Sequence, residues 1–315
     1  MTEAIKTAEA IVEASNKSKK IPIFVCFMGG AEVIKGINYL RRNNIPTFDI
    51  PEEAVDTLKA MIDYGQWKKA KAASIKEFDV DESKVKKLFD RCRSEDRLEI
   101  AEVEAREVLK AYNIPVPKAE VASDIDEAKE LIKDIKYPVV LKIVSPDILH
   151  KTDVGGIKVG ISNEKELEEN FEQIIWNVKK YMPDANIRGI LIQEMIKSNK
   201  ETIIGMSRDP QFGPMLMFGL GGIYVEVLKD VSFRIAPVSE GSARKMIQEI
   251  KAIKLLKGAR GEKESDIDSI VEVLMKMSQL VTDFPEIIEM DINPLFVNEI
   301  GKGSIAADAR IRIGG

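Results

Sequence analysis

The chain has 315 residues, of which 47 are basic and 52 acidic, and its formal net charge is −5. This length predicts about two domains, and the negative charge argues against a protein that binds nucleic acid through a basic surface. No apolar stretch approaches the roughly 20 residues that a membrane-spanning helix needs, and the acidic N-terminus is not a secretory signal. Two cysteines without metal-type spacing, Cys26 and Cys92, fit a reducing compartment and predict a cytoplasmic protein. The single histidine, His150, excludes chemistry that needs two histidines from this chain alone.

The first 75 residues predict an α/β segment. Helices are expected at 1–18, 31–42 and 52–73, and short apolar strands at 21–27 and 47–51. This alternation is typical of a parallel sheet with helical crossovers. Two strands are fewer than a stable sheet normally contains, so the segment predicts only half of a domain. We interpret the strongly charged stretch 76–97 as a solvent-exposed linker helix.

From residue 98 onward the pattern predicts an α+β domain whose strands pair mostly antiparallel. Helices are expected at 98–113, 124–135, 164–182, 240–256 and 264–282, and Asp124 is the expected N-cap of the second. Strands are expected at 137–146, 156–162, 189–196, 201–209, 214–220, 231–238, 287–297 and 304–313. We therefore predict two parts, a short α/β segment followed by a larger α+β domain.

Lys142 interrupts the apolar run 139–144. Burying an unpaired ammonium is costly, so this side chain must reach water or an anion. One interpretation is an edge strand with Lys142 on its wet face. The other is a lysine that binds phosphate.

The loop that follows, 145–160, contains His150 and the pair Gly155 and Gly156. Glycines let backbone N–H groups approach phosphate closely, and a neutral imidazole is a good nucleophile toward a phosphoryl group. An ordinary turn histidine is the alternative. The nearby Lys142 and Lys151 favour the interpretation as an anion site.

Three further segments carry polar groups of possible function. The strand end 191–196 could contact an adenine ring, although many strands end in this way. Glu289, Asp291 and Asn293 alternate and so share one face of a strand, where oxygen ligands suit a hard cation such as Mg²⁺. The alternative is an exposed acidic strand face. The glycine-rich stretch 217–234 fits either a close approach to phosphate or a simple turn.

Taken in order, these motifs resemble the ATP-grasp domain of the NDP-forming acyl-CoA synthetases, which include the ADP-forming acetyl-CoA synthetases and are related to succinyl-CoA ligase. The resemblance rests on VVLKIVSPDILHKTDVGGIKVG, LIQEMI, the segment 201–238 and EMDINPLFV. It covers residues 98–315 and implies a two-subdomain ATP-grasp fold. Residues 1–75 resemble the last part of the flavodoxin-like ligase domain that precedes it in fused members.

The resemblance implies the reaction acyl-CoA + ADP + phosphate ⇌ acid + CoA + ATP, with a phosphoryl group passed between two histidines. His150 matches the second histidine and Asp291 the acidic residue that stabilises phosphohistidine. Asn293 and Asp308 match the Mg²⁺ ligands. The implied contacts to ATP or ADP are Lys142, Gly155, Gly156, Gln193, Glu194, Met195, Ile196, Glu201 and Glu226.

The sequence departs from the family in two ways, because it has no CoA-binding Rossmann motif and no first catalytic histidine. An incomplete sheet and an incomplete catalytic set both predict a CoA-binding α-type partner subunit. That partner would supply the first histidine and the rest of the flavodoxin-like domain. A regulatory or non-catalytic ATP-grasp module is one alternative, and a carboxylate ligase that uses acyl phosphate without phosphohistidine is another. The acyl substrate and the choice between ADP and GDP are left open.

Overall fold

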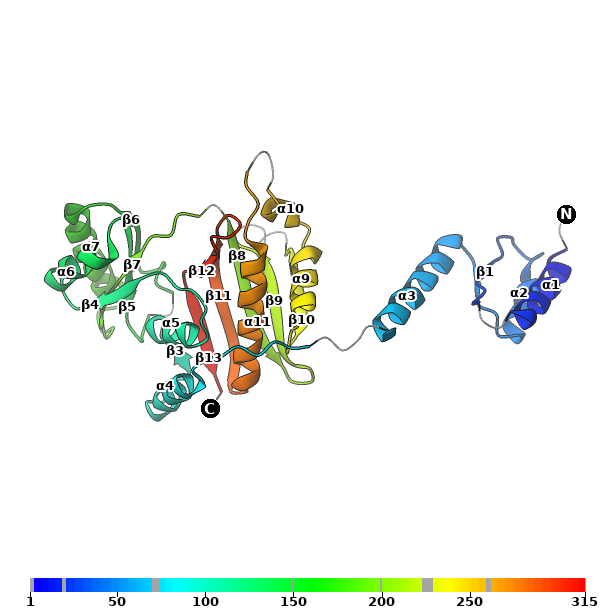
Figure 1. Cartoon of the computed structure of the whole chain (residues 1–315), viewed down its shortest axis with the longest axis horizontal. Coiled ribbons are helices and arrows are strands. Elements are labelled where there is room, and N and C mark those ends of the chain that lie inside the picture. Colours follow the sequence, from blue (N-terminus) through cyan, green and yellow to red (C-terminus); the bar gives the residue numbers. More distant parts are fainter. Residues whose placement is uncertain are drawn as a thin grey trace. The chain divides into compact units, whose positions relative to one another are not determined.

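A computed structural model describes residues 3–18, 21–69, 74–148, 150–198, 200–222, 229–258 and 262–314. The chain forms two compact units, unit 1 from Met1 to Ala73 and unit 2 from Ser74 to Gly315. Figure 1 labels the helices and strands of both. Over the described ranges, no helix is long and apolar enough to cross a membrane.

Unit 1 confirms the expected alternation of helices and strands. Its elements are α1 (Ala4–Lys17), β1 (Val25–Cys26), α2 (Ile34–Arg42), β2 (Thr47–Phe48) and α3 (Pro51–Lys69). The two short strands pair in parallel, as predicted. The buried core is small and consists of Ala8, Val25, Leu40 and Ile45. The 19-residue helix α3 has no buried residue at all, so its apolar side chains add nothing to this core.

The larger sheet of unit 2 has seven strands, ordered β10-β9-β8-β11-β13-β3 with β12 beside β11. Its strands are β3 (Glu99–Ile100), β8 (Glu201–Asp209), β9 (Gly213–Leu220), β10 (Val231–Ile235), β11 (Ile287–Val297), β12 (Ser304–Ala306) and β13 (Ala309–Ile313). All its pairings are antiparallel. The helices associated with it are α4 (Glu82–Ser94), α5 (Glu102–Ala111), α9 (Glu240–Glu249), α10 (Ile253–Leu256) and α11 (Ile267–Asp283). Side chains from these helices and from every strand except β10 form one continuous apolar core.

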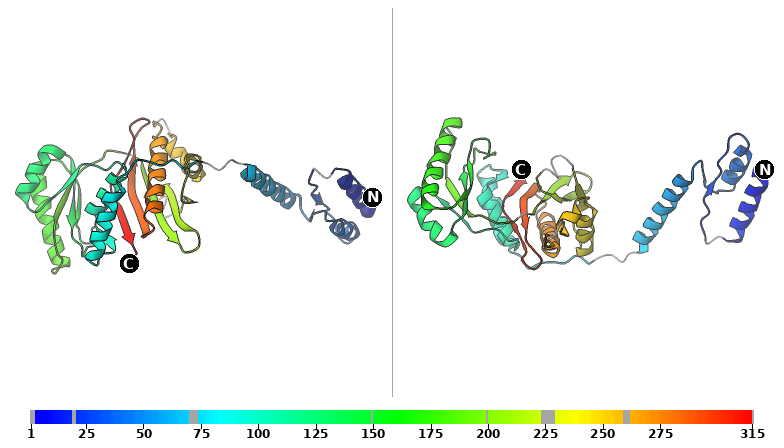
Figure 2. Two further views of the ribbon diagram at one scale, coloured as in Figure 1. Left: turned by 60° about the horizontal axis from the view of Figure 1, so that its bottom comes forward. Right: turned by 90° about the horizontal axis from the view of Figure 1, so that it is seen from above.

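The smaller sheet of unit 2 has four strands, ordered β4-β7-β5-β6. These are β4 (Ala119–Ala122), β5 (Val139–Val144), β6 (Ile157–Ile161) and β7 (Gly189–Glu194), and they also pair antiparallel. Helices α6 (Ile125–Ile135) and α7 (Glu164–Tyr181) pack on it around a separate core. Figure 2 shows these two green helices away from the orange helix α11 of the larger sheet. Unit 2 therefore contains two subdomains, each with its own sheet and core.

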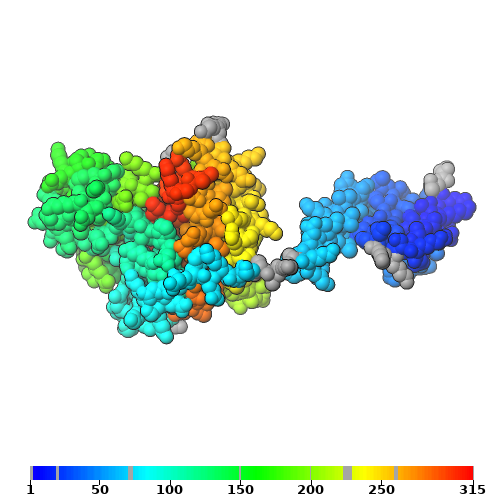
Figure 3. All heavy atoms as spheres, viewed as in Figure 1, coloured from blue at the N-terminus to red at the C-terminus, as the bar shows by residue number. Residues whose placement is uncertain are grey.

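The prediction of a solvent-exposed linker helix was wrong for α4. Its residues Val85, Leu88, Phe89 and Cys92 are buried and belong to the core of the larger sheet. In Figure 3 the cyan atoms of this part of the chain lie against the rest of unit 2. The many charged residues of α4 conceal this apolar face, because a helix needs only one stripe of apolar side chains to pack.

Three local predictions also need correction. The helix expected from residue 98 begins only at Glu102, because Glu99 and Ile100 pair with β13 as an edge strand. The helix expected over 240–256 divides into α9 and α10 where the buried Ile250 takes an extended conformation. The expected start of the last helix at 264 moves to Ile267, because the Asp266 carboxylate caps it by accepting from the Ser269 N–H at 3.1 Å.

Candidate functional site

Lys142 lies in β5, which runs between β7 and β6 and is therefore an interior strand. The residue as a whole is only 6% exposed. Its Nζ donates to Oε1 of Glu102 at 2.6 Å and to the carbonyl of Ala307 at 3.2 Å, and it lies 3.6 Å from Oδ2 of Asp308. The interpretation as a wet edge strand was wrong. Lys142 instead connects the smaller sheet to acidic groups of the larger subdomain.

Glu102, the first residue of α5, is the central anion of this cluster, and the sequence analysis missed it. Its Oε2 lies 2.9 Å from Nζ of Lys151, an ion pair between α5 and the loop after β5. Burial favours the neutral acid, but attraction to Lys142 and Lys151 outweighs burial and lowers the pKa of Glu102. An acid in the first helical turn is common, so only its partners, 40 and more residues away, reveal its importance.

The loop of His150 is built by a series of tight local turns. The Asp153 N–H donates to the carbonyl of His150 at 3.2 Å, and the N–H groups of Gly155 and Gly156 donate to Thr152 and Lys151 at 3.0 and 2.7 Å. Gly155 has φ +62°, and a Cβ on Gly156 would lie 2.6 Å from the Ile143 side chain. Glycine is therefore required for the turn itself. Both glycine N–H groups are already occupied within the loop, which does not support their predicted role as a cradle for phosphate.

His150 is exposed and lines a cavity of about 650 Å³, which we call the histidine cavity. Asp291 from β11 and Asp308 from the turn before β13 line the same cavity. Arginines also line it: Arg97, Arg188, Arg310 and Arg312. The structure thus brings the two predicted catalytic residues, His150 and Asp291, to one cavity.

The carboxylates of this cavity repel one another. Burial is the main cause of the raised pKa of Asp291; Arg310 opposes this shift, and Asp308 and Glu289 add to it. Burial, followed by repulsion from Glu102, raises the pKa of Asp308 despite the opposing lysines. Burial thus disfavours the charged form of both carboxyl groups, and a cation bound beside them would favour that form.

Asn293 and Asp308, the predicted Mg²⁺ ligands, are neighbours in the structure. The Asn293 N–H donates to the carbonyl of Asp308 at 3.1 Å. In the part of the chain that the structure describes, no three or more acidic, histidine or cysteine side chains form a metal cluster. An amide and a carboxylate nevertheless fit Mg²⁺, since this ion usually keeps several water ligands and binds substrate phosphates. The carboxyl group of Asp308, whose charged form burial disfavours, supports this fit because a cation would favour that form.

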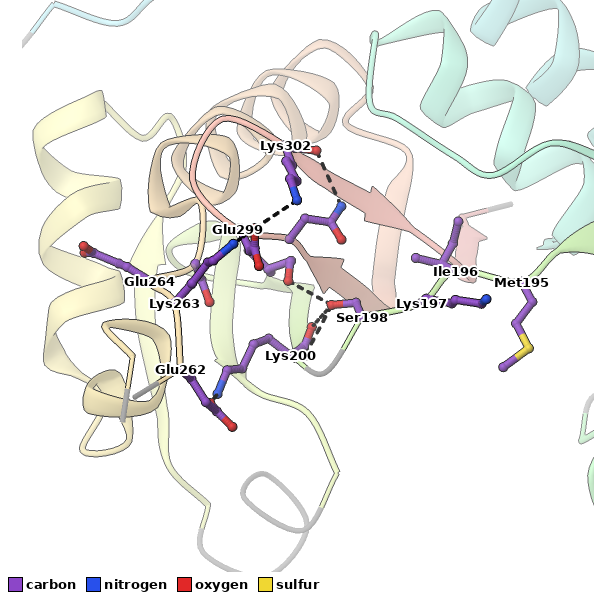
Figure 4. Close-up of a pocket in the computed structure, with 13 residues that line it drawn as sticks. Met195, Ile196, Lys197, Ser198, Lys200, Glu262, Lys263, Glu264, Glu299 and Lys302 are labelled. Carbon is purple, nitrogen blue, oxygen red and sulfur yellow. Dashed lines mark hydrogen bonds and ion pairs between the residues drawn. The ribbon is translucent and has the colours of Figure 1, made fainter. Parts of the chain in front are cut away.

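Met195 and Ile196, predicted to contact adenine, lie in the segment between β7 and β8 and line a second cavity of about 690 Å³. Figure 4 shows this cavity, which we call the hinge cavity. Its other walls come from Lys197, Ser198 and Lys200, from 262–265, and from 297–299 and Lys302. Charged groups surround it, including Lys200, which pairs with Glu262, and Glu299, which pairs with Lys302 at 2.9 Å. The cavity thus has an apolar wall beside charged side chains, a combination that suits a nucleotide.

Other residues that were predicted to contact the nucleotide form hydrogen bonds within the protein. The buried amide of Gln193 accepts from Arg106 of α5 at 3.2 Å, and the Met195 N–H donates to the carbonyl of Pro138 at 3.1 Å. Oε2 of Glu194 accepts from the N–H of Lys118 at 3.4 Å. Glu201 is exposed at the start of β8, where its carbonyl accepts from Gly221. The predicted Glu226 lies outside the described residues.

Comparison with known proteins gives three informative matches. A family model described as an ATP-grasp domain matches residues 91–313. The 4-hydroxybutyrate–CoA ligase [ADP-forming] of Nitrosopumilus maritimus is 48% identical over 306 residues, which are 97% of this chain and 44% of that protein. The acetate–CoA ligase [ADP-forming] I subunit beta of Pyrococcus furiosus is 48% identical over 229 residues, 73% of this chain and 97% of that subunit. The chain thus spans less than half the length of the first relative.

A solved structure of Ca. Korarchaeum cryptofilum dinucleotide-forming acetyl-coenzyme A synthetase 1 is also similar. It superposes with a TM-score of 0.64 at 41% identity and covers 73% of this chain and 99% of that one. That protein is in complex with coenzyme A and Mg-AMPPCP, and its phosphohistidine segment points towards the nucleotide-binding site.

Proposed function

Because this chain belongs to the ATP-grasp family, we propose that it is the nucleotide-binding part of an ADP-forming acyl-CoA synthetase. The overall reaction would be acyl-CoA + ADP + phosphate ⇌ acid + CoA + ATP. The observation that carries the proposal is that His150, the single histidine, lines one cavity with Asp291 and Asp308. The carboxylate of Asp308 lies 3.6 Å from the buried Lys142. ADP-forming CoA ligases that are 48% identical support it.

In the proposed step, an imidazole nitrogen of His150 exchanges a phosphoryl group with the nucleotide. With ATP, the bond between the β–γ bridging oxygen and the γ-phosphorus breaks as the nitrogen–phosphorus bond forms, and ADP leaves. We propose that Lys142 neutralises phosphate charge, which is the main catalytic task in phosphoryl transfer. Mg²⁺ held by Asn293 and Asp308 would add positive charge at the phosphates. Asp291 would face the phosphorylated imidazole when His150 lies in the histidine cavity.

We further propose that the adenine ring binds in the hinge cavity against Met195 and Ile196. The Met195 N–H is bonded to Pro138 and is therefore not the donor to the base. Backbone groups beyond Met195 in the same segment are the better candidates. Glu201 and Glu226 would also lie near the nucleotide. Gly155 and Gly156 would do so as parts of the loop that carries His150, residues 145–156, which we call the histidine loop.

The test of this function is phosphorylation of the purified chain by γ-labelled ATP and Mg²⁺. We expect a label that is lost in acid and kept in base, which is the behaviour of phosphohistidine, and removal of the label by added ADP. Label that survives acid would favour an acyl-phosphate-type or other phosphoprotein. Nucleotide binding without any label would favour a non-catalytic ATP-grasp module.

The activity would also need a partner, because the chain contains one histidine where the phosphoryl relay uses two. We propose a CoA-binding α-type subunit that supplies the first histidine, binds acid and acyl-CoA, and completes the flavodoxin-like domain of which residues 1–75 are the last part. The length of the Pyrococcus furiosus match, 229 residues, is about that of unit 2 alone and supports this division. The cytoplasm is the proposed location, supported by the buried thiol of Cys92.

Helix α3 is the proposed contact with that partner. Val55, Met61 and Trp67 are 62, 51 and 71% exposed on a helix without one buried residue. Because they are spaced six residues apart, these three side chains lie on different sides of α3, which favours a helix that a partner covers on several sides. We expect the chain to co-purify with the part of the Nitrosopumilus maritimus ligase that lies outside the matched residues, when the two are expressed together. Trp67→Asp should weaken this about tenfold or more.

Trp176→Asp is the matched control for that variant, since Trp176 is also exposed, at 57%, but lies on α7 of unit 2. It should leave co-purification unchanged. If the Trp67→Asp and Trp176→Asp variants co-purify equally well with the partner, α3 is not part of the interface.

A further inference from the structure

Glu102 connects three elements that the proposed function requires to act together. From the start of α5 its carboxylate reaches Lys142 of β5 through Oε1, at 2.6 Å, and Lys151 of the histidine loop through Oε2, at 2.9 Å. The side chains of Glu102 and Lys142 are each 7% exposed, and that of Lys151 is 19% exposed. This is a largely buried ion-pair network, which solvent screens far less than a surface pair.

The histidine loop has two kinds of anchor. Ile148 and Val154 are buried in the core of the smaller subdomain, so they hold both ends of the loop to its own sheet. Lys151 directly follows His150 and pairs with α5, whose apolar side chains belong to the core of the larger subdomain. The ion pair between Glu102 and Lys151 therefore attaches the part of the loop next to His150 to the larger subdomain.

In this position His150 lines the histidine cavity, whereas Met195 and Ile196 line the hinge cavity. A histidine that serves a nucleotide in the hinge region and a second centre elsewhere must change position between the two. Moving the loop separates Lys151 from Glu102 and leaves a buried carboxylate with one cation fewer, which is unfavourable.

We propose that Glu102 is a positioning residue that holds His150 at the histidine cavity by pairing with Lys151. The role of this hold in phosphoryl transfer rests on the proposed function, whereas the hold itself does not. Lys142 keeps the carboxylate charged and in place, so the lysine proposed to bind phosphate and the histidine loop share one anion. Loss of the pair should free the loop to leave the cavity more often.

The test is amide hydrogen exchange of the ligand-free full chain at Asp153, Gly155 and Gly156, whose N–H groups are bonded inside the loop. Lys151→Met removes the pair without touching Lys142, and Glu102→Gln removes the charge with little change of shape. Each should speed exchange at these amides by about tenfold. The double variant should exchange no faster than the faster single variant, because both changes break the same pair.

Glu107→Gln is the matched control, since Glu107 lies on the same helix and pairs at the surface with Lys84 and Lys110, at 2.6 and 2.7 Å. This variant should leave the rate of hydrogen exchange at the loop amides unchanged. Unchanged exchange in Lys151→Met, or an equal rise in Glu107→Gln, would overturn the proposal. Lys151→Met keeps the test decisive even if Glu102→Gln fails to fold.

A second measurement separates positioning from simple stability. With Lys151→Met we expect the initial rate of labelling by γ-labelled ATP to rise several-fold, about threefold or more, while the Kd for ATP stays within about twofold. Faster exchange with an unchanged labelling rate would reject a positioning role. A wild-type chain that takes no label would count against the proposed function, and the exchange data would then decide by themselves whether Glu102 holds the loop.

Discussion

Replacing His150 with asparagine is expected to abolish transfer of label from γ-labelled ATP to the protein. This residue is the single histidine of the chain, so no neighbouring imidazole can substitute for it. An asparagine amide is not a nucleophile toward phosphorus, and loss of a covalent nucleophile lowers a rate by about three orders of magnitude or more. The measurement is the acid-labile label on the intact chain after a fixed time with ATP and Mg²⁺.

Folding and nucleotide affinity serve as the controls for this variant. His150 is exposed and its backbone carbonyl makes the loop bond, so the substitution should leave the thermal transition and the loop unchanged. The Kd for ATP should stay within about twofold, a change under roughly 0.5 kcal/mol. Undiminished labelling would show that another residue accepts the phosphoryl group and would reject the assignment of His150.

Replacing Lys142 with methionine is expected to destabilise unit 2 by about 3–5 kcal/mol, because it removes one partner of a buried ion pair. The change leaves Lys151 as the remaining cation beside Glu102 and strengthens the repulsion between that carboxylate and Asp308. Methionine is similar in length, so lost charge rather than a cavity dominates. Denaturant unfolding compared with wild type measures the difference.

The variant that also carries Glu102→Gln is the matched control for Lys142→Met, since it removes the carboxylate that has lost one of its two cations. We expect this double variant to be more stable than Lys142→Met.

The pH dependence of the stability difference has a defined sign. The lowered pKa of Glu102 gives stability that is present above the ordinary pKa of the group and lost as the pH falls through its pKa in the folded state. The deficit of Lys142→Met should therefore shrink as the pH falls below about 4. A deficit that is unchanged at pH 3 would mean that packing, not charge, causes it.

The order of elements in both units follows from local patterns. Alternating apolar strands, the helix stripe of α7 and the cap at Asp124 act over a few neighbouring residues, and the structure confirms them. The Asp124 carboxylate accepts from the Glu127 N–H at 2.9 Å, as expected for an N-cap. The burial of α4 was not predictable from its composition, because the partner surface comes from helices and strands far along the chain.

For the candidate site, too, some features could be predicted from the sequence and others depend on the tertiary structure. The sequence by itself determined which residue is the single histidine and that Lys142 interrupts an apolar strand, since each depends only on residue type and a short spacing. Only the tertiary structure decided that Lys142 is buried, that Gln193 accepts from Arg106, and that Glu102 joins Lys142 to Lys151. Those decisions depend on which helix packs against which sheet, and electrostatic energy depends on distances in space that a linear spacing does not contain.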